Sequence, residues 1–146
     1  MVNASDNNQD KPLIAIFGAG MMGSGIAQVC IQAGYSVNLY GRSEKKLLEA
    51  RETIKKNLIR VAGKKKTDAR ETIKKNLIRV AGKKKTDVPL EPQALEQIAL
   101  LQLELLQIHT DIPSAVEDAA MAIEAVAENL DLKLDIFETI QKTCTE

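Results

Sequence analysis

A glycine-rich turn between an apolar strand and a helical segment constrains the fold of this chain more than any other feature. Residues 13–20 read LIAIFGAG, a short apolar run that ends in glycines and is typical of a buried parallel strand. Over residues 21–33 the apolar positions recur with helical spacing, and Gly34 follows as a helix-terminating glycine. The turn between the two segments carries a G-x-G-x-x-G pattern at Gly18, Gly20 and Gly23.

Each glycine of this pattern has its own physical reason at such a turn. Gly18 permits the tight turn, Gly20 lets the backbone approach a pyrophosphate, and Gly23 lets the helix pack closely on the strand. The free N–H groups and the positive dipole end of the helix favour a phosphate at the same place. The alternative is a glycine-rich turn without a ligand. Because a second strand follows directly after the helix, the context favours dinucleotide binding.

The rest of the chain continues to alternate strands with helices. Residues 35–40 predict the second strand, and Ser43 is suited to cap a long amphipathic helix. The apolar face of that helix consists of Leu47, Ala50, Ile54, Leu58 and Val61. Further along the chain we expect a helix at 94–101, a strand at 103–110, a helix at 114–119 opened by a capping box of Ser114 and Glu117, a strand at 121–128 and a helix at 130–144.

This order of elements predicts the α/β class and a Rossmann-like, doubly wound parallel sheet. The polar residues 1–12 are interpreted as a flexible lead-in. Residues 13–146 are then one dinucleotide-binding domain, which we expect to be incomplete at its C-terminus.

An exact repeat interrupts the long helix. The string ARETIKKNLIRVAGKKKTD occupies residues 50–68 and again 69–87, which favours a recent tandem duplication or an engineered insertion over a solenoid. Gly63 with the following lysines indicates a helix end, and Asp68 with Glu71 forms a capping-box pattern. We therefore expect a second helix near Ala69, so that a long helical hairpin extends from the domain surface after the second strand.

The residues after the second strand bear on the choice of cofactor. An acid that binds the adenosine ribose hydroxyls is expected at the end of that strand, but the chain has Gly41 there, followed by Arg42 and Ser43. The planar, charged fork of Arg42 suits a 2′-phosphate, and Ser43 adds a hydroxyl. The alternative is that Arg42 is a solvated surface residue and Glu44 takes the place of the acid. The pattern favours NADP over NAD.

Composition excludes several other classes of function. Lys plus Arg and Asp plus Glu balance at 20 each, and aromatic residues make up 3%, so neither nucleic acid nor a membrane surface is an expected partner. No segment reaches membrane-spanning length, and the first twelve residues match no signal or transit peptide. Cys30 and Cys144 lack metal-ligand spacing, which favours reduced thiols, no metal site and a cytoplasmic location.

Taken together, these segments resemble the N-terminal domain of the 3-hydroxyacyl-CoA dehydrogenases, including 3-hydroxybutyryl-CoA dehydrogenase. The resemblance covers nearly everything from Leu13 to Thr143 except the extra copy of the repeat. It is carried by IAIFGAGMMGSGIAQV, by IRVAGKKK, by HTDIPSAVEDA and, most specifically, by IEAVAENLDLKLDIFETI with its E-A-x-x-E-N-L stretch.

The resemblance implies an oxidoreductase of fatty acid metabolism that transfers hydride between NAD(P) and C3 of a 3-hydroxyacyl-CoA, with a homodimer for a full-length parent. It implies that Glu128 and Lys133 lie beside the nicotinamide, and that Asn57 and Lys64 meet coenzyme A. Because of the repeat, Asn76 and Lys83 are equivalent candidates. It further implies that the pyrophosphate is held by the main chain of Gly18, Ala19, Gly20, Met21, Met22 and Gly23.

Two departures from the family pattern qualify this expectation. The family usually has Asp where this chain has Gly41, and its catalytic His–Glu pair, with a nearby Ser and Asn, lies beyond this stretch. His109, the single histidine, is interpreted as a strand-end residue. We therefore expect no catalytic residue and little turnover by this chain alone. The alternatives are a fragment of a 3-hydroxyisobutyrate-type dehydrogenase and a non-catalytic nucleotide-binding or interaction module.

Overall fold

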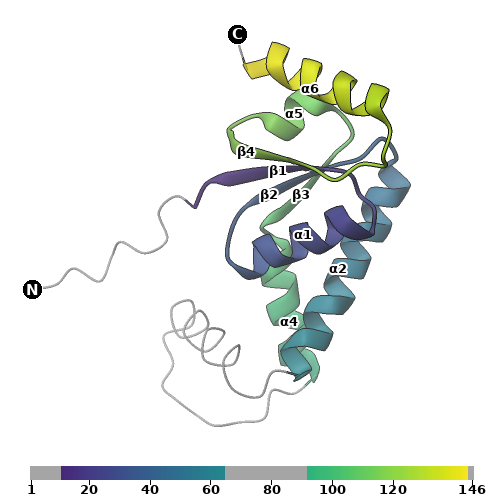
Figure 1. The fold of residues 1–146 in the computed structure, drawn as a ribbon. Coiled ribbons are helices and arrows are strands. Elements are labelled where there is room, and N and C mark those ends of the chain that lie inside the picture. The colour runs from purple at the N-terminus through teal and green to yellow at the C-terminus, as the bar shows by residue number, and fades with distance from the viewer. Residues whose placement is uncertain (1–10, 65–91, 145–146) are drawn as a thin grey trace, which may run out of the picture.

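The computed structural model describes residues 11–64 and 92–144, which form one α/β unit (Figure 1). Most of the expected lead-in, the second copy of the repeat and the helix expected near Ala69 lie outside these ranges. In chain order the elements are β1 (Leu13–Phe17), α1 (Met21–Gln32), β2 (Val37–Tyr40), α2 (Glu44–Lys64), α4 (Pro92–Leu103), β3 (Leu106–His109), α5 (Ile112–Val116), β4 (Ala119–Glu124) and α6 (Leu130–Cys144).

The four strands form one sheet in the order β3-β2-β1-β4, and every neighbouring pair is parallel. In the register, Phe17 lies beside Tyr40, and Tyr40 lies beside His109, so these three strands end at the same edge. The chain starts in the middle of the sheet and winds outward in both directions. This topology confirms the predicted doubly wound parallel sheet.

Alternating side chains of the strands pack into two separate hydrophobic cores. Ile14, Ile16 and Leu39 point to the face that α1, α2 and α4 cover. Ala15, Phe17 and Tyr40 point to the opposite face, which α5 and α6 cover (Figure 1). Since successive residues of a strand face opposite sides of the sheet, the uninterrupted apolar run of β1 serves both cores.

The long helix α2 begins as expected. The Ser43 hydroxyl oxygen accepts a hydrogen bond from the N–H of Lys46 at 3.4 Å. The apolar face buries Leu47, Ala50, Ile54 and Leu58, and it packs on Ala99 and Leu103 of α4. A Lys55–Glu96 ion pair of 3.0 Å joins the same two helices. The first copy of the repeat, which starts at residue 50, therefore supplies most of the helix that follows β2.

The start of α5 differs from its prediction. The helix begins after Asp111, whose carboxylate accepts a hydrogen bond from the N–H of Ser114 at 2.8 Å. Pro113 fits the first turn because it needs no hydrogen bond there. The expected cap at Ser114 is therefore wrong by three residues, since Ser114 lies inside the helix. The expected helix at 114–119 and strand at 121–128 are accordingly found earlier, at Ile112–Val116 and Ala119–Glu124.

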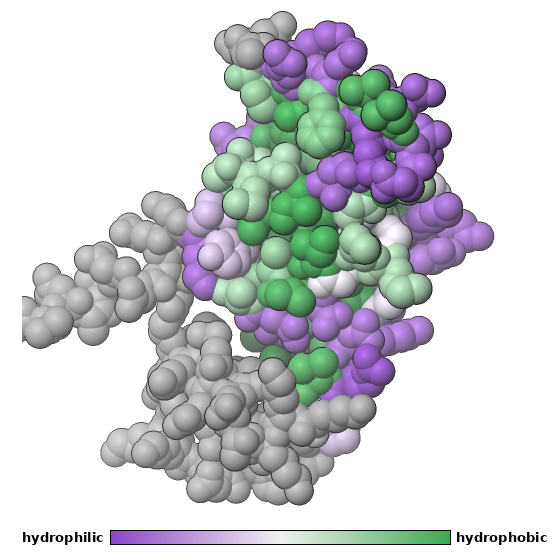
Figure 2. All heavy atoms as spheres, viewed as in Figure 1, coloured by the Kyte–Doolittle hydropathy of each residue, from purple (hydrophilic) through white to green (hydrophobic). Residues whose placement is uncertain are grey.

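The surface of the described part is apolar where β4 forms the edge of the sheet. Apolar residues gather across the middle of the face in Figure 2. Large exposed hydrophobic side chains on β4 and α6 are Met121, Leu130, Leu134 and Phe137. Across residues 11–64 and 92–144, no helix is both long and apolar enough to cross a membrane. The same ranges bring together no group of three His, Cys, Asp or Glu side chains suited to a metal ion.

Candidate cofactor-binding site

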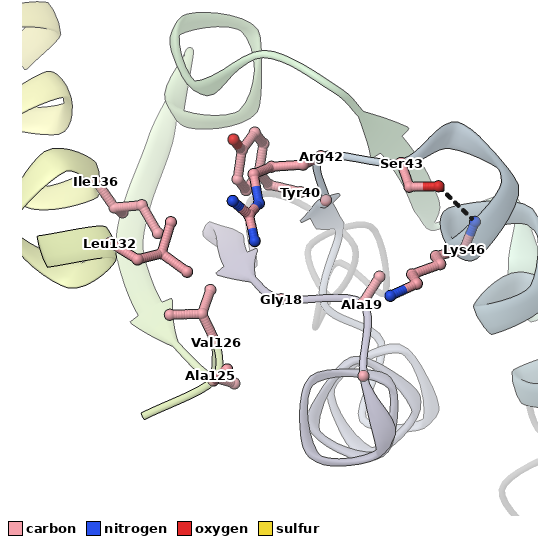
Figure 3. A pocket seen from close by; sticks show the side chains of 13 residues that line it. Gly18, Ala19, Tyr40, Arg42, Ser43, Lys46, Ala125, Val126, Leu132 and Ile136 are labelled. Atoms are coloured by element: carbon pink, nitrogen blue, oxygen red, sulfur yellow. Dashed lines mark hydrogen bonds between the residues drawn. The ribbon is translucent and has the colours of Figure 1, made fainter. Parts of the chain in front are cut away.

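A cleft of about 460 Å³ opens at the carboxyl ends of β1, β2 and β4 (Figure 3). In a doubly wound sheet this is the edge at which ligands bind, on either side of the first strand. The wall beside α6 is apolar, and the opposite wall is formed by the segment from the end of β2 to the first turn of α2. The lining residues are Gly18, Ala19, Gly20, Tyr40, Gly41, Arg42, Ser43, Lys46, Ala125, Val126, Ala127, Leu132 and Ile136.

Two glycines of the loop are required by the packing of the backbone itself. Gly18 has φ +120°, and a Cβ atom there would lie 2.4 Å from the carbonyl oxygen of Ala125. A Cβ atom on Gly23 would lie 1.8 Å from the carbonyl oxygen of Gly18. Both contacts are far inside van der Waals distance. Gly18 thus permits the close approach of β1 to the segment after β4, and Gly23 lets α1 pack against the loop.

Gly20 differs from the other two glycines. Its φ of −79° and ψ of −171° are accessible to any residue. A Cβ atom at this position would meet no protein atom within 4 Å. Neither backbone strain nor packing within the described chain therefore requires a glycine at position 20. The space in front of it opens on the cleft.

The amino end of α1 offers uncapped N–H groups beside this space. Gly20 is the N-cap residue and provides no side-chain hydrogen bond, and the first turn contains no acidic residue. The first helical hydrogen bond runs from the N–H of Ser24 to the carbonyl oxygen of Gly20, 2.9 Å apart. The earlier N–H groups of a helix have no intrahelical partner and are suited to an anion. Met21 and Met22 expose their side chains, and neither these two residues nor Gly23 line the cleft.

The opposite wall is positively charged. The N–H of Gly41 donates to the carbonyl oxygen of His109 at 3.1 Å, which holds the segment after β2 against β3. From this segment Arg42, Ser43 and Lys46 line the cleft, and Figure 3 shows the Lys46 side chain extending toward Ala19. Within the described ranges, the lining set contains two cationic side chains and no carboxylate.

Glu128 and Lys133 form a separate charged cluster after β4. The Lys133 ammonium lies 2.9 Å from a Glu128 carboxylate oxygen and 3.3 Å from one of Glu124. The hydrogen bond with Glu128, followed by the Glu124 contacts, raises the pKa of Lys133 above its usual value. Glu124 is the least exposed member and also accepts from the N–H of Val126 at 2.7 Å. None of the three lines the cleft.

The two positions expected to meet coenzyme A lie far along α2. Asn57 is thirteen residues past Glu44, which is roughly 20 Å along the helix axis, and Lys64 is roughly 30 Å along it. Asn57 is half-buried and does not line the cleft. The equivalent residues of the second copy, Asn76 and Lys83, lie outside the described ranges.

His109 ends β3 beside Tyr40 and does not line the cleft. Its Nε2 atom is buried without a hydrogen-bond partner among the described residues. It also lies near Asp111, whose pKa is lowered mainly by hydrogen bonding from Ser114, with a smaller contribution from the charge of His109. The geometry gives His109 a place at the strand end and none in the cleft.

Six of the predicted cofactor-binding residues therefore line the cleft, and the other five do not. The six are Gly18, Ala19, Gly20, Gly41, Arg42 and Ser43. Lys46 was not predicted from the sequence. The available signal was its position in the first turn of the helix that follows Ser43. Sequence reasoning also missed the apolar wall, to which Val126, Leu132 and Ile136 belong. The apolar spacing of α6 was visible in the sequence, but no local signal directed that face toward the glycine loop.

Comparison with known proteins shows which family this chain belongs to. The family described as 3-hydroxyacyl-CoA dehydrogenase, NAD binding domain, matches residues 13–91 and, in a second overlapping match, residues 67–146. A hydroxyacyl-coenzyme A dehydrogenase of Rattus norvegicus, described as mitochondrial, is 29% identical over 133 residues, covering 91% of this chain and 35% of the relative. A probable 3-hydroxyacyl-CoA dehydrogenase of Caenorhabditis elegans is 33% identical over 131 residues, covering 90% and 36%.

A solved structure of a diketoreductase superposes with a TM-score of 0.64 at 26% identity, covering 90% of this chain and 38% of the other. The chain thus spans about a third of the length of the curated relatives that it matches. The residues that carry the sequence resemblance, the parallel sheet and the glycine cleft agree with the family match. The chain belongs to the family of 3-hydroxyacyl-CoA dehydrogenase NAD-binding domains.

Proposed function

We propose that this chain is the dinucleotide-binding part of an oxidoreductase that transfers hydride between NAD(P) and a 3-hydroxyacyl-CoA. Membership of the family supports the cofactor class, and the names of the relatives support the substrate class. When bound, the nicotinamide accepts or donates the hydride. The residues of this chain bind the cofactor, orient it and neutralise its phosphates.

The open space in front of Gly20 is the single observation that carries this proposal. The two neighbouring glycines are explained by contacts within the protein, whereas a side chain at position 20 would meet no atom within 4 Å. A pyrophosphate needs such a space, because its oxygens must reach main-chain N–H groups without an intervening side chain. The uncapped amino end of α1 lies beside this space and favours the negative charge.

A substitution at Gly20 tests this proposal. Thr serves about as well as Gly at an N-cap position, so Gly20→Thr retains the helix start while its side chain fills the cradle. The matched control is Gly25→Thr, because a Cβ atom there also meets nothing within 4 Å and Gly25 does not line the cleft. We expect the first variant to lose at least tenfold in NAD(P)H affinity, measured by nicotinamide fluorescence, and the control to bind as the parent does. Equal binding by both variants at unchanged melting temperature would refute the proposed phosphate cradle.

The roles of the remaining predicted residues also belong to this proposal. Glu128 and Lys133 are proposed to face the nicotinamide end of the cofactor, and Asn57 with Lys64 to meet the coenzyme A moiety. The homodimer and the cytoplasmic location stay predictions. The single histidine lies outside the cleft, so we expect the 146-residue chain to bind cofactor without measurable oxidation of 3-hydroxybutyryl-CoA.

That same position of His109 favours a second candidate, a non-catalytic nucleotide-binding module. The two candidates differ in their response to coenzyme A ligands. If Asn57 and Lys64 bind coenzyme A, acetoacetyl-CoA should shift the affinity of this chain for NADH, because the binding of two ligands to one protein is coupled reciprocally. No change in NADH affinity at saturating acetoacetyl-CoA, together with intact cofactor binding, would favour the non-catalytic module.

A further inference from the structure

We propose that the charged wall of the cleft is a phosphate subsite formed by Arg42, Ser43 and Lys46, and that it selects NADPH over NADH through the 2′-phosphate of the adenosine ribose. The inference rests on the proposed function, because it concerns the same cleft and the same class of cofactor. Its new element is Lys46, which the fold brings to the wall beside Arg42.

The charge of the wall is not compensated within the described part of the chain. Arg42 and Lys46 both line the cleft, and neither has a carboxylate partner in residues 11–64 or 92–144. By contrast, Lys55 and Lys133 are paired with glutamates. Two unpaired cations beside an apolar wall form a site suited to a dianionic group.

The acid that would select the 2′-hydroxyl is absent from this wall. Gly41 is buried, and a Cβ atom there would lie 3.1 Å from Cγ of Leu47 and 3.2 Å from Cβ of Ala19. Leu47 is itself fully buried, so there is little room for a side chain at position 41. A carboxylate at position 41 would therefore require Leu47 to move.

The nearest carboxylate in the sequence faces elsewhere. Glu44 begins α2, but it lines a groove along the outer side of that helix, together with Lys45, Glu49 and Lys56. It does not line the cofactor cleft. Of the two sequence interpretations, the geometry supports Arg42 over Glu44 as the residue nearest the ribose.

The three residues of the wall offer complementary donors. Arg42 presents a planar fork of N–H groups, and Lys46 presents a compact ammonium. The Ser43 hydroxyl oxygen already accepts from the N–H of Lys46, which leaves its hydrogen free to donate to an anion. Figure 3 shows Arg42 extending into the middle of the cleft and Lys46 extending toward Ala19, while the Ser43 hydroxyl lies at the start of the helix.

The test compares dinucleotides and fragments that differ only in the 2′-phosphate. The 146-residue chain is titrated with NADPH and NADH by fluorescence, and 2′,5′-ADP and ADP are used as competitors. We expect NADPH to bind at least tenfold more tightly than NADH, and 2′,5′-ADP to compete at least tenfold better than ADP. The preference should shrink as salt is raised, since exposed charges are screened.

Substitutions test whether the charged wall causes the preference for NADPH. Arg42→Ala and Lys46→Ala should each weaken NADPH about tenfold and leave NADH nearly unchanged. The matched control is Lys45→Ala, which removes the adjacent lysine from the outer groove and should change neither affinity. Equal or tighter binding of NADH by the parent chain overturns the inference and leaves the proposed function standing. Loss of NADPH affinity in Lys45→Ala as large as in Lys46→Ala also overturns it. Binding of neither dinucleotide overturns both.

Discussion

The buried amide of Asn38 gives a quantitative test of how the sheet is joined to the helices behind it. Asn38 lies in the middle of β2, is 5% exposed, and donates from Nδ2 to the carbonyl oxygen of Ala115 in α5 at 3.0 Å. Both ends of this hydrogen bond are buried. It fixes α5, against which α6 and its cleft residues pack.

Asn38→Ala leaves the carbonyl oxygen of Ala115 buried without its partner. An orphaned buried acceptor costs about 1–3 kcal/mol of unfolding free energy. For a domain of this size each kcal/mol lowers the melting temperature by roughly 4 °C, so we expect a fall of roughly 4–12 °C. Because α6 carries part of the apolar wall, cofactor affinity should fall as well.

Urea and thermal unfolding followed by circular dichroism measure this change. The matched control is Gln107→Ala, which removes an amide from the residue beside Asn38 in the register, where the side chain is exposed. An exposed substitution of this kind changes the free energy of unfolding by about 0.5 kcal/mol or less. If the two variants unfold at the same temperature, the hydrogen bond to α5 is not a source of stability and the reasoning fails.

Further predictions concern backbone packing and pH. Gly23→Ala should lower the melting temperature, because its Cβ atom would lie 1.8 Å from the Gly18 carbonyl oxygen, whereas Gly25→Ala should raise it, since Ala is the better helix former in open space; equal shifts would contradict this packing. Hydrogen bonding from Ser114 lowers the pKa of Asp111, so the contribution of this carboxylate to stability is present above its ordinary pKa of 3.8 and is lost as pH falls through the lowered value. Asp111→Asn should flatten that part of the acid unfolding curve while retaining the cap, and an unchanged curve would contradict this. The hydrogen bond with Glu128 raises the pKa of Lys133, so the contribution of the ion pair to stability is present below the ordinary pKa of 10.5 and is lost as pH rises through the higher folded value. Lys133→Met should reduce the loss of stability seen on alkaline titration, and an equally steep loss in the variant would count against the pair.

Much of the fold could be predicted because its signals are local. The apolar run of β1, the glycines after it and the stripe on α2 each follow from backbone geometry and from the period of the apolar residues. The boundaries were less predictable where two caps compete. Ser114 followed by Glu117 fits a capping box, but Asp111 before Pro113 starts the helix one turn earlier. Proline at the second helical position favours the earlier start, since it is pre-set for a first turn and needs no N–H bond.

The sequence by itself determined the alternation of strands and helices, the glycine loop and the absence of an acid at position 41. Only the tertiary structure decided which residues share the cleft. Lys46 and Glu44 lie two residues apart at the start of one helix, yet a rotation of about 200° between them places Lys46 at the cleft and Glu44 outside it. The repeated strings have the same local propensities, and the structure shows the first copy packed on α4. Local sequence fixes what each segment prefers, but the direction that a side chain faces depends on long-range packing between segments far apart in the chain.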